Sequence, residues 1–113
     1  MRLPGVERAV VDRAKIRDYL LSMEHPIGRF KAAFFCALGY SRGEWERLRE
    51  DLLEVARTGV AVEGRRNVFG QMYEVRGMLV GPSGRRANIT TVWIIVHGDD
   101  SPQLVTAFPG EGR

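Results

Sequence analysis

The spacing of the apolar residues changes near residue 60, and this change limits the folds that the chain can adopt. Before residue 60, apolar side chains recur every three or four positions, which is typical of amphipathic helices. After it they recur at every second position, which is typical of strands. Helices first and short-turned strands afterwards indicate an α+β fold, with three N-terminal helices packed on a four-stranded antiparallel β-meander.

The first predicted helix begins after Asp12, whose carboxylate can cap it. Four of its residues fall on one face at helical spacing and are expected to be buried: Ile16, Tyr19, Leu20 and Met23. The chain then breaks at Glu24-His25-Pro26. A residue before proline favours extended backbone, whereas proline itself suits the first position of a helix.

The second predicted helix therefore has His25 as its cap, and it ends at Gly39, because glycine suits the C-terminal end of a helix. Its expected inward side chains are Ile27, Phe30, Phe34 and Leu38. The third helix starts where Ser41 and Glu44 have the spacing of a capping box, and it ends at Gly59. It is expected to bury Trp45, Leu48, Leu52 and Val55.

The four predicted strands cover residues 60–64, 69–80, 87–97 and 104–108. Gly81-Pro82-Ser83-Gly84 separates two of them and predicts a hairpin turn, in preference to a phosphate-binding loop. A second turn at residues 98–102 precedes the last strand, which Pro109 stops. The third strand is apolar on both faces from Val92 to Val96, which indicates a central position in the sheet.

The length of 113 residues suits one domain, and 44% hydrophobic with 27% charged residues is typical of globular proteins. We expect residues 1–113 to form a single domain, with a loosely ordered arm at 1–8 and a loosely ordered tail at 110–113. The longest apolar run, Val92 to Val96, is far shorter than the roughly 20 residues that a membrane helix needs. No secretory signal is evident, so a cytoplasmic protein without membrane contact is expected.

Counting excludes several kinds of chemistry. The single cysteine, Cys36, and two histidines far apart in sequence give no zinc-binding spacing. The glycine-rich phosphate-binding motifs and the serine nucleophile elbow are also missing from the sequence. Asp99 and Asp100 are adjacent residues of a turn and are interpreted as solubilising. We therefore expect neither a metal ion nor a cofactor.

The type of basic residue says more about a possible anionic partner than the net charge does. The net charge is +3 and the isoelectric point is about 9.5, which is mildly basic. Of the 17 basic residues, Lys15 and Lys31 are the only lysines, and the others are arginines. The planar guanidinium suits phosphate groups and so favours RNA as a partner. The alternative is that a GC-rich genome encodes arginine in place of lysine throughout.

The segment from His25 to Lys31 carries the densest chemical signal. A helix N-terminus attracts anions through its free N–H groups and its partial positive charge. Here an imidazole, Arg29 and a lysine join it, and Gly28 permits a close approach. In the alternative interpretation, His25 only caps the helix, and Arg29 and Lys31 form a solvated face.

Candidate residues also occur in the second half of the chain. Tyr73 shares a predicted strand face with Phe69 and Val75. In one interpretation its hydroxyl reaches a phosphate; in the alternative it is a half-buried structural tyrosine. Thr106 is the polar residue of an apolar strand, although threonine is also a good strand former. Arg85 and Arg86 follow the predicted hairpin turn. Together with Arg29 they are the predicted RNA-binding residues.

Two groups of motifs carry a resemblance to a known family. The first half contains Lys15-Ile16-x-x-Tyr19-Leu20-Leu21 and His25-Pro26-x-Gly28-x-x-Lys31-Ala32-x-Phe34-Phe35. The second half contains Tyr73-Glu74-Val75, Gly81-Pro82-x-Gly84, Thr91-Val92-Trp93 and Leu104-Val105-Thr106-Ala107-Phe108-Pro109. The chain resembles, over residues 9–109, a family of small bacterial and phage proteins without an established activity. The resemblance implies a toxin–antitoxin or effector setting, in which members accompany a small partner gene or end larger toxin-like proteins.

The layout also resembles the superfamily that joins barnase, EndoU, colicin RNases and RelE toxins. Its members place helices before an antiparallel four-stranded sheet, and several end with a strand like Thr106-Ala107-Phe108-Pro109. The resemblance implies RNA cleavage without metal, through the neighbouring 2′-hydroxyl. This sequence departs from the well-characterised members because it has no convincing Glu/His pair at their spacing.

Two hypotheses for the function follow. The first is a metal-free endoribonuclease of toxin type, which needs an acid, a base and cations near the phosphate. Its candidate catalytic residues are His25 as acid or base, Lys15 and Lys31 with Arg29 as charge stabilisers, and Tyr73 and Thr106 as phosphate or proton-relay groups. The alternative is a non-catalytic module that binds a toxin–antitoxin or phage protein, such as a small cognate antitoxin-like protein. The first hypothesis predicts that Lys15, His25 and Lys31 converge, because the link between the two helices is short.

Overall fold

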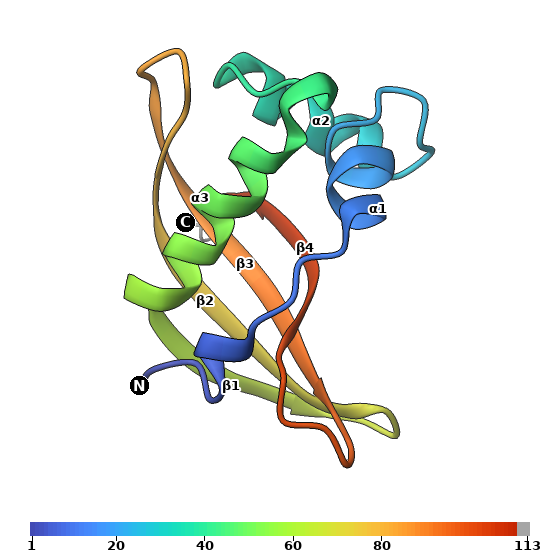
Figure 1. Ribbon diagram of the computed structural model, residues 1–113, viewed down its shortest axis with the longest axis vertical. Coiled ribbons are helices and arrows are strands. Elements are labelled where there is room, and N and C mark those ends of the chain that lie inside the picture. Colours follow the sequence, from blue (N-terminus) through green and yellow to red (C-terminus); the bar gives the residue numbers. More distant parts are fainter. Residues whose placement is uncertain (111–113) are drawn as a thin grey trace.

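The computed structural model describes residues 1–110, and its element order is that of an α+β fold (Figure 1). The helical segments are η1 (Val6–Arg8), α1 (Arg13–Lys15), η2 (Ile16–Leu20), α2 (Gly28–Ala37), η3 (Arg42–Glu44) and α3 (Trp45–Thr58). The strands are β1 (Val60–Arg66), β2 (Gly70–Val80), β3 (Arg86–Val96) and β4 (Gln103–Pro109). All neighbours pair antiparallel in the order β1-β2-β3-β4, so the predicted α+β class and meander are confirmed.

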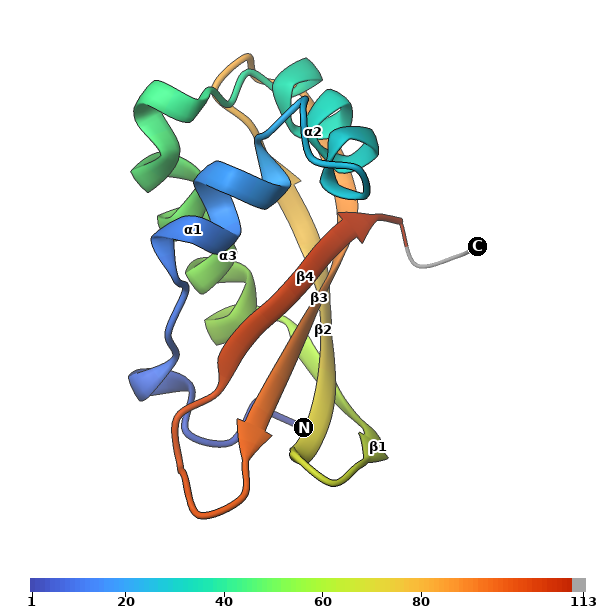
Figure 2. The same cartoon turned by 90° about the vertical axis from the view of Figure 1, so that its right-hand side faces the viewer.

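Helix α3 covers one face of the sheet, whereas α2 lies at the end of β4, and much of the opposite face is open (Figure 2). On the covered face, Val75 and Trp93 are fully buried against Leu52 and the other core residues. On the open face, β1 and β2 present side chains that are about half exposed, such as Val62 and Met78. The apolar alternation in β3 therefore places Val92 and Ile94 on a partly solvated surface.

A β-bulge in β4 decides which way Thr106 points. Leu104 pairs with Trp93 and Thr106 pairs with Val92, so Val105 is an extra residue in the strand. In a regular strand, residues 104 and 106 would share one face, and Thr106 would point into the core. With the bulge, Leu104 is buried, whereas Thr106 lies on the other face and is only partly buried.

The rotation of α2 differs from the expected one. Ala32, Phe35 and Leu38 face the core, whereas Ile27 and Phe30 are 63% and 70% exposed. Periodicity alone predicts burial equally for every apolar residue at helical spacing. Instead, the close approach of Gly28 to the segment around Tyr19 fixes which side of α2 faces inward: a Cβ at residue 28 would lie 2.1 Å from the Tyr19 carbonyl oxygen.

Two local expectations at the helix ends are also wrong. Met23 is 58% exposed, because the helical segment ends at Leu20 and the chain leaves the helical face before residue 23. The Ser41 side chain makes no capping hydrogen bond; it precedes the short 3₁₀ turn η3, and α3 begins only at Trp45. The inward residues of α3 are confirmed for Leu48, Leu52 and Val55, whereas Trp45 is half-buried.

The N-terminal residues that were expected to form a loose arm pack against the domain. Leu3 is buried, and the Met1 carbonyl accepts a hydrogen bond from the Ala61 N–H at 2.9 Å. Of the expected tail at 110–113, residues 111–113 lie outside the described residues, and Gly110 donates its N–H to the Asn88 carbonyl. Within residues 1–110, none of the helices has the length and apolar character needed to cross a membrane.

Candidate functional site

Tyr19 lies in a π-helical turn, η2, that continues directly from α1. As expected, Asp12 caps this helical segment by accepting a hydrogen bond from the Ala14 N–H at 3.0 Å. Ile16 and Leu20 are fully buried and anchor the turn, so the ring of Tyr19 is held half-buried between core and solvent. Single π-helical turns occur frequently at functional sites, because the wider turn redirects side chains.

Lys31 and Thr106 are distant from Tyr19 in the sequence, and both form hydrogen bonds with its hydroxyl. The Nζ of Lys31 on α2 donates hydrogen bonds to the Tyr19 hydroxyl at 2.7 Å and to Thr106 Oγ1 at 2.8 Å. The two hydroxyl oxygens of Tyr19 and Thr106 are 3.2 Å apart and are themselves hydrogen-bonded. We call Tyr19, Lys31 and Thr106 the hydroxyl–lysine cluster.

Lys15 and His25 complete the surroundings of the Tyr19 ring. Lys15 Nζ lies 5.3 Å and Lys31 Nζ 5.1 Å from the ring centroid. The imidazole of His25 packs edge-on against the same ring, with 4.9 Å between the ring centroids. The structure thus brings Lys15, His25 and Lys31 together, and the residue that joins them is Tyr19.

The environment of Tyr19 lowers the pKa of its hydroxyl. Burial alone raises the pKa of Tyr19, but the hydrogen bonds from Lys31 and Thr106 and the positive charges of Lys31 and Lys15 act in the opposite direction. Together these groups hold the pKa below its ordinary value of 10.0. A tyrosine with a lowered pKa in an open site is suited to proton transfer.

Tyr40 shows the opposite behaviour and serves as a comparison. Its hydroxyl donates a hydrogen bond of 2.6 Å to the Asp51 carboxylate, and the residue is buried. Burial and the negatively charged partner both raise the pKa of Tyr40. Tyr40 is therefore a structural tyrosine whose pKa is raised, whereas the surroundings of Tyr19 lower its pKa.

His25 caps α2, as one of the two sequence interpretations held. Its Nδ1 accepts hydrogen bonds from the Ile27 N–H at 3.0 Å and from the Gly28 N–H at 2.9 Å. The lone pair on Nδ1 is therefore in use, and the proton of the neutral ring is on Nε2. This arrangement leaves His25 as a hydrogen-bond donor through Nε2 and disfavours a role as general base.

We expect His25→Ala to lower the free energy of unfolding by about 1 kcal/mol, the typical effect of losing a helix cap. His25→Asn should restore most of this loss, since an asparagine side chain can accept the same N–H groups. Urea denaturation of the wild type and both variants measures the difference. Equal stability of the alanine variant and the wild type would show that the two hydrogen bonds contribute nothing.

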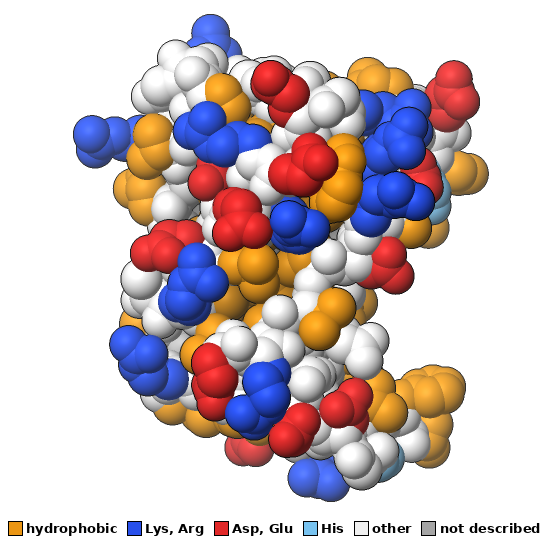
Figure 3. Space-filling view, viewed as in Figure 1, with side chains coloured by type: hydrophobic (Ala, Val, Ile, Leu, Met, Phe, Trp, Pro, Cys, Tyr) orange, Lys and Arg blue, Asp and Glu red, His pale blue; other side chains and the backbone are white. Residues whose placement is uncertain are grey.

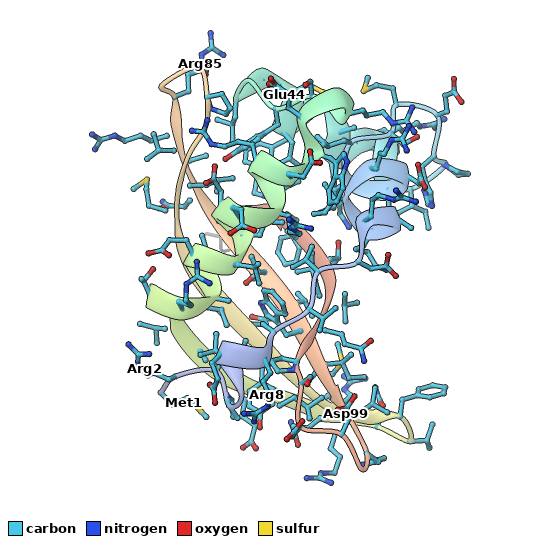
Figure 4. The ribbon with its side chains drawn as sticks, in the orientation of Figure 1. Met1, Arg2, Arg8, Glu44, Arg85 and Asp99 are labelled. Carbon is cyan, nitrogen blue, oxygen red and sulfur yellow. The ribbon has the colours of Figure 1, made fainter. Side chains whose placement is uncertain are left out.

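The other candidate residues lie apart from the hydroxyl–lysine cluster. Tyr73 is 8% exposed and packs in the core on the covered face of β2, as a structural tyrosine would. Arg29 is exposed on α2 and stacks over Phe30. Arg85 and Arg86 are exposed at the hairpin between β2 and β3, where Figure 4 shows Arg85 pointing into solvent. None of the hydrogen bonds and ion pairs described for residues 1–110 joins these four residues to the cluster.

A hollow of about 430 Å³ lies at Tyr19, the one residue of the cluster that lines it. It is lined by Asp12, Ala14, Lys15, Asp18, Tyr19 and His25. Basic side chains gather on the surface around α1 (Figure 3), where the chain contributes Arg13, Lys15 and Arg17 within one short segment. The lining itself combines Lys15 and the imidazole of His25 with the carboxylates of Asp12 and Asp18, and Asp18 forms an ion pair with Arg42. Lys15 is therefore the lining residue that can hold an anionic group.

Fold and site together define a class: an α+β domain in which helices cover one face of a four-stranded meander and a Tyr–Lys–Thr cluster lies beside its last strand. The chain belongs to the family described as a domain of unknown function, DUF6883, whose family model matches residues 2–111.

One chain of a solved complex has a similar fold. The complex is described as "Contact-dependent growth inhibition toxin - immunity protein complex from Klebsiella pneumoniae 342". The match has 19% sequence identity and a TM-score of 0.69, and it covers 96% of this chain and 98% of the other. At this identity the likeness shows the fold alone. No curated protein sequence matches the chain.

Proposed function

We propose that this protein is a metal-free endoribonuclease of toxin type, which cleaves RNA through the 2′-hydroxyl. The observation that carries the proposal is the hydrogen bond from Lys31 to Tyr19, a tyrosine whose pKa is lowered. Tyr19 lines a hollow together with Lys15 and His25. The cleavage needs a base, an acid and positive charge near the phosphate, and these residues can supply all three.

In this mechanism the phenolate of Tyr19 takes the proton of the 2′-hydroxyl. The 2′-oxygen then attacks the phosphorus atom, and the bond from phosphorus to the 5′-oxygen breaks. The leaving 5′-oxygen takes a proton from the ammonium group of Lys31. The products are a 2′,3′-cyclic phosphate and a 5′-hydroxyl. Proton transfer from the Tyr19 hydroxyl to the Lys31 amine, along their 2.7 Å hydrogen bond, restores the starting state.

The remaining groups stabilise charge. Thr106 accepts a hydrogen bond from Lys31, so its own proton is available to the oxygen of Tyr19. Lys15 lines the hollow and can neutralise the charge that develops on the phosphate oxygens. The Nε2–H of His25 can donate to the same oxygens. Two ammonium groups thus supply the positive charge that the chemistry needs, and the proposal includes no metal ion.

The pH dependence of cleavage follows from the base role of Tyr19. Because the phenolate is the active form, kcat/KM should rise with pH and level off below pH 10, the ordinary pKa of tyrosine. Lys15→Met removes a positive charge that lowers the pKa of Tyr19, so the inflection should move upward. Cleavage rates from pH 5 to 10 measure both effects. An inflection that stays in place would contradict the assignment of Tyr19 as the base.

The direct test of the proposal is incubation of the purified protein with mixed cellular RNA in the presence of a chelator. We expect fragments that carry 2′,3′-cyclic phosphate and 5′-hydroxyl ends, and growth arrest when the protein is expressed without a partner. Intact RNA and harmless expression would together overturn the ribonuclease proposal. The fold supports the toxin setting, because the similar chain belongs to a toxin–immunity protein complex.

A second candidate function, a protein-binding module, is favoured by a specific feature of α2. Ile27 and Phe30 are 63% and 70% exposed, although both are large and apolar, and they lie on the helix that carries Lys31. Exposed apolar groups beside a site favour contact with another protein. Phe30→Asp should weaken binding of a small cognate protein under either hypothesis. If the protein is a ribonuclease, the variant should still cleave RNA at the wild-type rate. If it is only a binding module, neither the wild type nor the variant cleaves RNA.

A further inference from the structure

A second hollow, of about 510 Å³, lies beside β4 and shares two lining residues with the one at Tyr19. It is lined by Val10, Asp12, Lys15, Ile94, Gln103, Leu104 and Val105. Asp12 and Lys15 line both hollows, so the two are adjacent, and a phosphate bound at Lys15 would lie between them. The volume falls within the roughly 300–1,000 Å³ that is common for small-ligand sites.

The backbone makes the walls of this hollow rigid. Val10 forms a parallel β-bridge with Gln103 through two hydrogen bonds: its N–H donates to the Pro102 carbonyl at 2.8 Å, and its carbonyl accepts from the Leu104 N–H at 3.0 Å. The bulge residue Val105 forms part of the opposite wall. The hollow is thus built by main-chain pairing on β4 and does not depend on a mobile loop.

The lining combines apolar walls with three polar residues, Asp12, Lys15 and Gln103. Val10, Ile94, Leu104 and Val105 offer apolar contact for a flat ring. Asp12 is held in place because one carboxylate oxygen caps the helix at Ala14. Gln103 offers both an amide donor and an acceptor. A nucleobase has this pattern, with apolar faces and a polar edge.

We propose that this second hollow binds the nucleobase next to the cleaved phosphate and selects a base with an exocyclic amino group. The assignment rests on the proposed ribonuclease function, because Lys15 at the junction of the hollows is taken to hold the phosphate. The Asp12 carboxylate accepts hydrogen bonds only, so it favours the amino group of adenine, cytosine or guanine. Uracil offers the carboxylate only its N3–H, which lies between two carbonyl oxygens that repel a negative charge, so its binding is disfavoured.

The test uses short oligonucleotides with 2′-O-methyl groups, which cannot be cleaved through the 2′-oxygen. Oligomers that contain adenine or cytosine should bind about tenfold more tightly than oligo-uridine, a modest value for one base contact. Methyl NMR signals of Ile94, Leu104 and Val105 should shift on binding. Asp12→Asn keeps a helix cap but replaces the carboxylate, so the base preference should fall to about twofold or less. Gln103→Ala should reduce it as well.

The control is Met78→Ala, on the open face of the sheet and outside the hollow, and it should preserve the base preference. Binding without base preference, methyl shifts confined to residues outside the hollow, or no binding at all would each overturn the proposal. The proposed function fails separately: base-selective binding at the hollow with no cleavage of unmodified RNA would reject the ribonuclease and retain the base-binding site.

Discussion

Replacing Lys31 by methionine should reduce RNA cleavage about 10³–10⁴-fold, because one substitution removes both a proton donor and a charge stabiliser. Lys31 donates hydrogen bonds to both hydroxyl groups of the cluster, and its charge lowers the pKa of Tyr19. Methionine keeps the aliphatic length of the side chain, and the residue is only partly buried, so the melting temperature should change little. Single-turnover cleavage of a labelled RNA measures the effect.

Two variants control for this result. Lys31→Arg keeps the positive charge but is a poorer proton donor, so it should restore part of the activity. Arg57→Met removes a positive charge on α3 that pairs with Glu54, away from the cluster, and should leave cleavage unchanged. Activity of Lys31→Met within tenfold of the wild type would exclude Lys31 from the chemistry.

Tyr19→Phe should reduce cleavage about 10²–10⁴-fold, the usual contribution of a positioned base. The substitution removes only the hydroxyl, so the ring contacts with Lys15 and His25 are kept. The residual activity should no longer rise with pH toward the wild-type inflection, because the titrating group is missing. Rate measurements across the pH range, on protein shown to be folded, test this expectation.

Tyr40→Phe is the matched control, since it removes the hydroxyl of a structural tyrosine. It should preserve cleavage but lower the free energy of unfolding by about 1–3 kcal/mol, because Asp51 loses the hydrogen bond from a buried partner. If Tyr19→Phe keeps both the rate and the pH profile of the wild type, the proton-transfer role of Tyr19 is wrong.

The strands could be predicted from the sequence because short turns fix where each begins. Gly81-Pro82-Ser83-Gly84 forms the hairpin between β2 and β3, where Gly84 has a positive φ of 88°. The rotation of α2 could not be predicted, since Ile27 and Phe30 match the helical period as well as Phe35 does. A backbone contact of Gly28, which has no side chain to reveal it, decides between the two faces.

Part of the candidate site was also visible in the sequence. The sequence indicates Lys15, His25, Lys31 and Thr106 as site residues, but it favours Tyr73 as the site tyrosine and predicts Tyr19 on an apolar helix face. Tyr19 is missed because the site depends on two departures from regular secondary structure. These are the π-helical turn that carries Tyr19 and the bulge before Thr106. Regular periodicity cannot show either of them. The signal that could have found Tyr19 is its place in a motif with Lys15.

The hydrogen bonds of the cluster have a consequence for the synthesis of the protein. Lys31 and Tyr19 reach Thr106 across 75 and 87 residues of sequence, so the first and last elements of the domain must both be in place. Translation delivers the N-terminal helices first and β4 last. Within this domain the cluster can therefore form only after β4 has been synthesised and has paired with β3. Under the proposed ribonuclease function, we expect a chain whose synthesis stops before β4 to be inactive, because Tyr19 and Lys31 then have no Thr106 to bind.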